Sequence, residues 1–351
     1  MNPVWQTHLH NCNATIENNC VIHFGNITAE LKDTQTETIM ADLSHHGLIR
    51  FSGEETQTFL QSQLSCDVRE INVQKAQYGS YCTPKGRVLA SFLLWQQNND
   101  FLMQLPASLT ASIQKRLALY VLRSKVQLID ASNDLIRIGI AGPYAATLIE
   151  EITGLSGNLD QSQLHIIHNE KATILYLAHN RMELITSIEN APALWKRLNQ
   201  RATSVGASCW DWLNIQSGIP VILPEIQEEF LPQMINLDAI GGISFKKGCY
   251  PGQEIVARTQ YLGKLKRRMF LAHIATTETV KTGDALYSTD MNDQSSGNIV
   301  NAVSSPDGGF DVLAVIQQSS VDTCTIHWQT LQGPVLKIKS LPYIALRAGN
   351  N

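Results

Sequence analysis

The cysteine at position 249 is the residue whose surroundings most favour chemistry. It lies in the segment Lys247-Gly248-Cys249-Tyr250-Pro251-Gly252-Gln253-Glu254. Lys246 and Lys247 precede it, and nearby cations favour the thiolate, the form that acts as a nucleophile or as a transient metal or sulfur ligand. The glycines leave room for close approach, and the Gln and Glu side chains can fix the loop or orient a partner. The pattern predicts a functional thiol that its neighbours present, although an arbitrary cysteine is more often a small buried hydrophobe.

The other cysteines lack such a setting. The chain has seven cysteines at long and irregular spacings, and an odd number cannot all pair within one chain. No Cys-x-x-Cys occurs, and no His–Cys cluster has the spacing of a zinc site. We therefore expect cytosolic thiols, no dedicated metal site, and packing roles for Cys12, Cys20, Cys66, Cys82, Cys209 and Cys324.

Length and composition describe an ordinary globular protein. The chain has 351 residues, of which 44% are hydrophobic and 17% charged, enough for two or three domains. A net charge of -4 argues against a broad basic surface, so we expect no direct nucleic-acid binding. The N-terminus shows no basic start followed by an apolar run, and no stretch approaches the roughly 18 apolar residues of a spanning helix. These features predict a soluble cytoplasmic protein without membrane contact.

The pattern of apolar residues predicts two similar units. Residues 1 to about 40 read as a loose polar leader with one short strand at 20–24. We then expect a strand at 48–51 and a helix that a capping box of Ser52 and Glu55 opens. A hairpin of strands 77–82 and 87–94 should follow. After it we expect a helix that starts after Ser108 and continues through Tyr120 and Val121, and then a strand at 126–129. This β-α-β-β-α-β order is ferredoxin-like. Strands at 136–141, 172–177 and 182–186, with helices from Pro143 and over 191–198, form the second unit.

The remaining chain differs from these units. Short apolar runs at 269–274, 298–303, 310–315 and 324–328, separated by Gly, Asp and Ser, predict a small β-barrel or sandwich. Before them, residues 230–258 fit neither helical nor strand periodicity, and their Gly-Gly, Lys-Gly and Pro-Gly steps indicate a loop. Loops of this length in compact proteins are usually functional.

These motifs together resemble the YgfZ family. The string KGCYPGQE, with GGISFK before it and VAR after it, looks like the family signature, and FLPQ followed by NL at 230–237 matches its upstream pattern. Further matches are Gly53, FLQSQL with Asp-Val at 59–68, Lys-Gly-Arg at 85–87 and Gly-Ile-Pro at 218–220. The resemblance covers about residues 43–343. An eight-residue match with ordered flanks is far more specific than an isolated short motif.

The resemblance implies an α+β fold like that of the glycine-cleavage aminomethyltransferases. That fold is a three-domain ring with two ferredoxin-like α/β units, a small C-terminal β-barrel and a central tetrahydrofolate pocket. The implied domains are 1–46 with 135–267, which bind folate and carry the KGCYPGQE loop, then 47–134, and 268–348.

The resemblance also implies particular site residues. A folate-contacting Trp of the family is similar in position to Trp210, and a second such Trp aligns with His46. Gln216 stands where the transferases carry a Glu that holds the pterin, and Arg258 ends the signature. Trp212 is assigned to the core.

The transferases carry an acid–base Asp where this chain has Ala90 and Ser91. Neither side chain can serve as the anionic partner that proton transfer to a departing amine requires. Gln216 can still hydrogen-bond to a pterin, but without the charge of a carboxylate. The resemblance therefore implies an accessory protein that binds folate rather than a classical transferase, and the enzyme question stays open.

The implied role is support of iron–sulfur protein maturation or repair, and through it of tRNA modification. Tetrahydrofolate or a derivative is the implied cofactor, and iron–sulfur assembly proteins or client enzymes are the implied partners. An active tetrahydrofolate-dependent aminomethyltransferase or demethylase is the alternative. A cationic run of Lys246, Lys264, Lys266, Arg267 and Arg268 could receive a folate glutamate tail or a phosphate, but a solvated edge is the commoner explanation of such a run.

Overall fold

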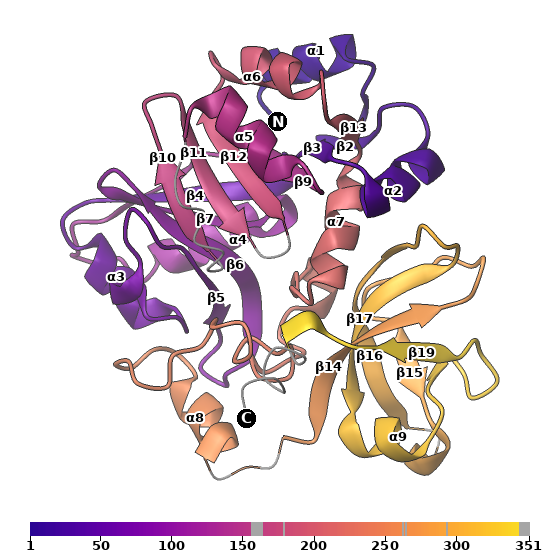
Figure 1. Ribbon diagram of the computed structural model, residues 1–351. Coiled ribbons are helices and arrows are strands. Elements are labelled where there is room, and N and C mark those ends of the chain that lie inside the picture. Colours follow the sequence, from indigo (N-terminus) through magenta and orange to yellow (C-terminus); the bar gives the residue numbers. More distant parts are fainter. Residues whose placement is uncertain (156–163, 178–179, 262, 264, 293, 344–351) are drawn as a thin grey trace. The chain divides into compact units, whose positions relative to one another are not determined.

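The computed structural model describes residues 1–155, 164–177, 180–261, 263, 265–292 and 294–343 (Figure 1). The chain forms two compact units. Unit 1 comprises Met1–Thr56, Glu70–Gln77 and Leu94–Asp211, and unit 2 comprises Gln57–Arg69, Tyr78–Leu93 and Trp212–Asn351. The division into three domains stays a prediction, and its last boundary, residue 348, lies outside the described residues. Among the described residues, no helix has both the length and the apolar content that crossing a membrane requires.

The first forty residues are folded, and the expectation of a loose leader is wrong. They form α1 (Pro3–Asn11), the hairpin β1 (Thr15–Glu17) and β2 (Cys20–His23), and α2 (Ile27–Thr36). The side chains of Asn2 and Asn26 accept hydrogen bonds from the first turns of the two helices, so the abundant Asn acts as helix caps. Trp5 and Leu9 anchor α1 because both are fully buried.

Unit 1 is built on a six-stranded sheet in the order β10-β11-β12-β9-β3-β13. The strands are β3 (Ile39–Asp42), β9 (Leu135–Ala141), β10 (His165–His168), β11 (Ala172–Leu177), β12 (Arg181–Ser187) and β13 (Thr203–Val205). All neighbours are antiparallel except β13 and β3. The expected strands at 136–141, 172–177 and 182–186 are confirmed.

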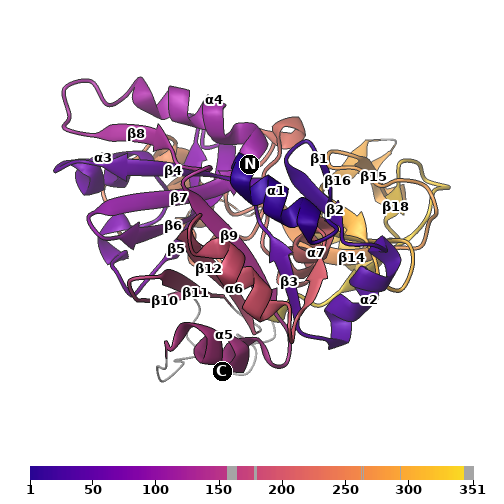
Figure 2. The ribbon, with the colours of Figure 1, turned by 90° about the horizontal axis from the view of Figure 1, so that it is seen from above.

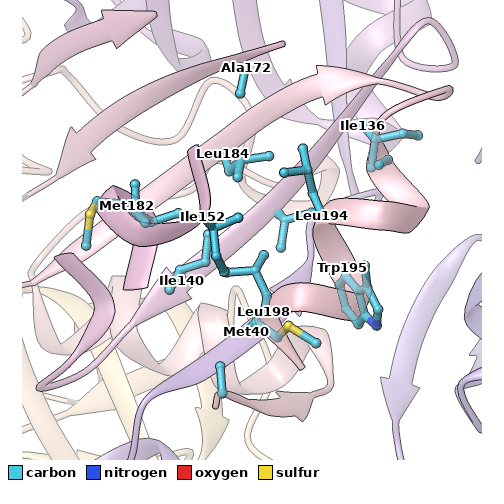
Figure 3. Packing of buried hydrophobic residues seen from close by; sticks show 14 of the residues in the cluster. Met40, Ile136, Ile140, Ile152, Ala172, Met182, Leu184, Leu194, Trp195 and Leu198 are labelled. Atoms are coloured by element: carbon cyan, nitrogen blue, oxygen red, sulfur yellow. The ribbon is translucent and has the colours of Figure 1, made fainter. Parts of the chain in front are cut away.

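One face of this sheet carries the main core of unit 1. Side chains at alternate positions of β9, β11 and β12 point to α1, α5 (Ala145–Thr153) and α6 (Ala191–Leu198), which cover that face (Figure 2). Figure 3 shows Ile136 and Ile140 from β9 packed with Leu184, Leu194 and Trp195. Because side chains alternate across a strand, the intervening residues of β9 and β12 face the other way.

A second sheet has the order β5-β6-β7-β4-β8. Its strands are β4 (His46–Ser52), β5 (Gln77–Cys82), β6 (Val88–Gln97), β7 (Asp100–Pro106) and β8 (Gln127–Asp130). The elements α3 (Thr56–Gln63), a 3-10 turn (Val68–Glu70) and α4 (Ala107–Ala118) connect them. The sequence prediction missed β7, which lies between the hairpin and α4.

Two helix predictions in this region are wrong in detail. Helix α3 begins at Thr56, so Ser52, the last residue of β4, does not cap it. The carboxylate of Glu55 instead accepts a hydrogen bond from the backbone N–H of Lys125. Helix α4 ends at Ala118, so Tyr120 and Val121 lie beyond it.

The C-terminal part of unit 2 is a curled antiparallel sheet in the order β18-β15-β16-β17-β14-β19. It consists of β14 (Arg267–Ile274), β15 (Ala285–Tyr287), β16 (Ser295–Ser304), β17 (Phe310–Gln317), β18 (His327–Trp328) and β19 (Leu336–Lys339). A 3-10 turn (Thr289–Met291) and α9 (Gln318–Thr323) lie between strands. The β prediction is confirmed, except that 324–326 precede β18. The sheet encloses an apolar core that includes Leu286, Val312 and Trp328.

A buried carboxylate ties this sheet to the C-terminal half of α7 (Ala207–Gln216). Oδ2 of Asp311 accepts hydrogen bonds from Trp212, Gln216 and Ser305, at 2.8, 3.0 and 3.1 Å. Its Oδ1 contacts His273 Nδ1 at 3.0 Å and Lys339 Nζ at 2.9 Å. Burial alone would raise the pKa of Asp311, but the bonds from Lys339, Trp212 and His273 outweigh it and lower the pKa.

We predict that Asp311→Asn destabilises the protein by about 3–5 kcal/mol, because an amide cannot accept from all these donors. Urea unfolding at pH 7 measures the change, and Asp307→Asn, on an exposed turn, is the matched control. Since the folded-state pKa is lowered, the contribution of Asp311 is present above the unfolded pKa near ~4 and is lost as the pH falls below it. Equal stability of the two variants at pH 7 would contradict the role given to Asp311.

Candidate functional site

The signature segment begins in a loop and ends in a helix. After a 3-10 turn (Pro224–Ile226), the chain has no regular helix or strand until α8 (Gln253–Tyr261). The loop prediction is therefore confirmed up to residue 252, whereas 253–258 are helical, contrary to expectation. Gly252, with φ +82°, makes the turn into α8.

Lys247 fastens this loop to the end of another helix. Its Nζ donates to the backbone carbonyls of Gln61 at 2.6 Å, Cys66 at 2.9 Å and Leu64. These carbonyls lie at and just beyond the C-terminus of α3, where helical C=O groups lack intrahelical partners. The Nζ atom also lies 5.1 Å from the centroid of the Tyr250 ring. Lys247 is therefore a buried clamp on the loop.

Gly252 and Gly86 allow the loop to pack on the hairpin turn between β5 and β6. The turn is closed by a hydrogen bond from the N–H of Gly86 to the carbonyl of Thr83, at 2.9 Å. A Cβ on Gly252 would lie 2.5 Å from Gly86 Cα and 2.5 Å from Thr83 O, closer than atoms can approach. The Lys-Gly-Arg turn and the signature are thus two halves of one packed structure.

Cys249 is the one exposed thiol among the seven cysteines, all of which are described. It lies between exposed Gly248 and buried Tyr250, so the clamped loop presents it to solvent. Burial raises the pKa of Cys66 and of Cys82 to about 12, which makes these two thiols inert at neutral pH. Among the other signature residues, the Gln253 amide donates to the carbonyl of Lys247 at 3.3 Å, and Glu254 is exposed.

The residues that we expected in place of transferase acids, Ala90, Ser91 and Gln216, have structural contacts in unit 2. Ala90 is fully buried. The hydroxyl of Ser91 donates to the carbonyl of Pro220 at 2.9 Å and accepts from the N–H of Ile222 at 3.1 Å. Gln216 donates its amide hydrogen to Asp311. Arg258 lies on α8 with its side chain exposed.

The cationic run is divided among different roles. Arg268 forms a bidentate pair with Asp238, at 2.6 and 2.8 Å. Lys266 and Arg267 line a pocket of about 420 Å³ with Arg87 and Glu229. Lys264 lies outside the described residues.

Unit 1 holds a second group of candidate residues, on the sheet face opposite its apolar core. Trp210, which is 1% exposed, lies against this face. A Cβ on Gly139 of β9 would lie 2.6 Å from the Trp210 ring, so the glycine makes room for the indole. The guanidinium carbon of Arg181 lies 4.7 Å from the centroid of that ring.

Buried polar groups surround Trp210. The Gln104 amide donates to both carboxylate oxygens of Glu183, at 3.1 and 2.9 Å, and Arg137 donates to the carbonyl of His46 at 2.7 Å. Arg137 is only 3% exposed, yet its Nε and Nη1 have no hydrogen-bond partner among the described residues, and the same holds for Gln104 Oε1. Buried donors of this kind are usually satisfied in native proteins, so a polar ligand would complete this group.

His46 belongs to the same group. It is the first residue of β4, is buried, and its ring centroid lies 4.2 Å from that of His45. Burial, together with the charges of His45, Arg137 and Arg181, holds the pKa of His46 well below its usual value, so the ring is neutral.

The structure thus places the predicted residues in two groups. His46 and Trp210 belong to unit 1, and Gln216, Arg258 and the signature belong to unit 2. Sequence reasoning missed Arg137, Arg181 and Glu183. The available signal was charged residues between buried apolar ones, one in β9 and two in β12, which is unusual for strands buried on both faces.

We predict that Lys247→Met lowers the free energy of unfolding by at least about 2 kcal/mol, since three carbonyls lose their donor. Lys246→Met, at the exposed neighbouring position, is the control. Burial lowers the pKa of Lys247 to about 8, so between pH 8 and about 10.4 the unfolded state binds more protons than the folded state. The stability advantage of the wild type over Lys247→Met should therefore grow from pH 7.5 to pH 9.5 in urea unfolding. An advantage that shrinks over this range would contradict the buried clamp.

Comparisons with known proteins agree with this architecture. A family model described as the GCVT N-terminal domain matches residues 17–246. The tRNA-modifying protein YgfZ of Colwellia psychrerythraea is 29% identical over 308 residues, which cover 88% of this chain and 94% of the relative. The protein of that name from Yersinia enterocolitica is 28% identical over 316 residues, or 89% of this chain and 94% of the relative.

A solved structure shows the same fold. The glycine cleavage system aminomethyltransferase T from Bartonella henselae superposes with a TM-score of 0.77 and 17% identity, over 97% of each chain. The expected α+β, aminomethyltransferase-like architecture is therefore confirmed. Because the family model spans more than half of the sequence, the chain belongs to the GCVT N-terminal domain family.

Proposed function

We propose that this chain has a YgfZ-type role, as a folate-binding accessory protein that supports the maturation or repair of iron–sulfur proteins and, through them, tRNA modification. The observation that carries the proposal is the exposed Cys249, held by a clamped loop in a chain whose curated relatives are named tRNA-modifying proteins. A fixed, exposed thiol suits the transient binding of a metal ion, a sulfur atom or a partner protein.

Tetrahydrofolate or a derivative is the proposed cofactor. The buried polar atoms around Trp210 fit a ligand with a flat ring and a polar edge, because Arg137 and Gln104 leave donors and an acceptor without protein partners among the described residues. Trp210 and His46, both in unit 1, are the proposed contacts. Gln216 and Arg258, the other two expected contacts, belong to unit 2 and stay predictions. When bound, a reduced folate would supply a one-carbon carrier. The indole of Trp210 is the flat surface on which its ring would stack.

An active aminomethyltransferase or demethylase is the second candidate, favoured by the shared fold. The residues at 90 and 91 argue against it, because Ala90 has no polar group and the Ser91 hydroxyl is engaged with the backbone at Pro220 and Ile222. A turnover assay with tetrahydrofolate and a methylamine donor separates the two functions. Robust aminomethyl transfer by the unmodified protein would favour the enzyme.

The partners proposed are iron–sulfur assembly proteins or client enzymes of the cytoplasm. No contact with nucleic acid or a membrane is part of the proposal.

We predict that the protein binds a reduced folate and that Trp210→Ala weakens binding by ~1–3 kcal/mol, the range for stacking of a flat heterocycle on an aromatic side chain. Titration calorimetry measures the affinity, and tryptophan fluorescence gives an independent readout. Trp195→Ala is the matched control, since Trp195 is also fully buried in unit 1 but packs in the apolar core. Circular dichroism must show both variants folded. Unchanged affinity in a folded Trp210→Ala protein would remove Trp210 from the site.

We predict that Cys249→Ser keeps the fold and the folate affinity but impairs iron–sulfur enzymes in cells that lack the native copy, because the hydroxyl is a poor nucleophile and metal ligand. Cys66→Ser is a buried control for the loss of a thiol as such. In the wild type, iodoacetamide should label Cys249 well before Cys66 or Cys82, as followed by mass spectrometry. Full complementation by Cys249→Ser would refute the functional thiol, as would equal labelling rates.

A further inference from the structure

We propose that His45, His46 and Asp211 form a binding site for a divalent first-row transition-metal ion, a function separate from the proposed folate and thiol chemistry. Each residue offers one ligand atom, and the three atoms all lie within 4.8 Å of one another. All three residues belong to unit 1. The sequence predicted no metal site, because that expectation considered only ligands at short spacings. Asp211 is too far from the two histidines in the sequence to be found in that way.

Distances within the group are close to those of a metal site. His45 Nε2 lies 3.4 Å from Asp211 Oδ1. An ion about 2.0–2.2 Å from each ligand would hold neighbouring ligand atoms roughly 3–3.5 Å apart. This pair therefore already has ligand spacing, and only the His46 ring, tilted by 42° to that of His45, must come slightly closer.

The backbone fixes the three residues. His46 begins β4, and its N–H donates to the carbonyl of Leu43 at 3.0 Å. The carbonyl of His45 accepts from the N–H of Ala107 at 3.1 Å, and Asp211 lies within α7. Side chains on such rigid positions can reach a metal by small rotations, without loss of backbone structure.

The imidazole of His45 lacks hydrogen bonds that would satisfy its nitrogens. Both ring nitrogens of His45 are buried without a hydrogen-bond partner among the described residues, and His46 is 7% exposed. Buried polar atoms of this kind are destabilising unless they are satisfied, and a metal ion would satisfy one of the two His45 nitrogens. The side chain of Asp211 is 39% exposed, which leaves an entry path for the ion.

The donor set and the surrounding charges define the class of ion. Two imidazoles with one carboxylate suit Zn²⁺, Co²⁺ or Fe²⁺ and leave coordination positions for water or a ligand, whereas Mg²⁺ and Ca²⁺ prefer oxygen. Arg137 and Arg181 add positive charge beside the group, and the buried carboxylates of Asp42 and Glu183 offset it.

Zinc titration of the full chain tests the proposal. The protein is stripped with a chelator and carries Cys249→Ser, which removes the exposed thiol as a competing ligand. Calorimetry should show one equivalent of Zn²⁺ bound, and His45→Asn or Asp211→Asn should each weaken binding at least tenfold. His168→Asn, at an exposed position of β10, is the matched control and should bind as the parent does. Zn²⁺ should also raise the melting temperature of the parent but not of Asp211→Asn.

Two results would overturn the proposal. One is a parent that binds no zinc, and the other is binding that survives both His45→Asn and Asp211→Asn unchanged. Asp211 is half-exposed, so its variant remains informative if the His45 variant does not fold.

His46→Asn is measured against both zinc and folate, because His46 is also a proposed folate contact. Loss of folate affinity alone would assign His46 to folate and refute the three-ligand site, whereas loss of zinc alone would support it. Folate binding by the parent is scored separately, so failure of one proposal leaves the other standing.

Discussion

The candidate thiol site depends on the ammonium group of Lys247. A long loop without regular structure has little intrinsic reason to hold one conformation, because each ordered residue loses conformational entropy. Here one buried cation satisfies the carbonyls of Gln61, Leu64 and Cys66, which the end of α3 leaves unpaired. The contact between Gly252 and the turn at Gly86 fixes the loop at a second point. Between these two points, Cys249 is held exposed while its neighbour Tyr250 is buried. The sequence suggested Lys247 as an activator of the thiol, but in the fold Lys247 holds the loop that carries the thiol.

The two faces of the six-stranded sheet of unit 1 differ in the residues they carry. One face carries isoleucines and Leu184 under three helices, and Trp195 of α6 packs on it. Burial of this face supplies the hydrophobic stabilisation. The other face carries Arg137, Arg181 and Glu183 at the intervening positions, beside Trp210 and the histidines. Buried charges contribute little to stability and are tolerated when they are paired. A polar face with unpartnered donors is therefore better explained by a ligand than by the fold, and both the folate and the metal proposals draw on it.

The residues that we expected in place of transferase acids have structural contacts. Ser91 fastens the backbone at Pro220 and Ile222, and Gln216 is one of the donors that hold the buried Asp311. A side chain committed to such contacts is not available as an acid or base, since proton transfer requires a group within reach of the substrate. A shared fold therefore does not by itself imply a shared reaction, because fold and function are separable.

The sequence by itself determined the α+β class, most of the strands, the C-terminal β structure and the prominence of Cys249. These features follow from local periodicity and from a motif of eight adjacent residues. Tertiary structure decided the rest. The ordered N-terminal helices depend on a core to which distant strands contribute, and β7 became evident only through its pairing with β4. The clamp of Lys247, the donors around Asp311 and the meeting of His45 and His46 with Asp211 join residues separated by up to 186 positions. Such contacts leave no periodic trace in a single sequence, because the fold alone sets which side chains converge.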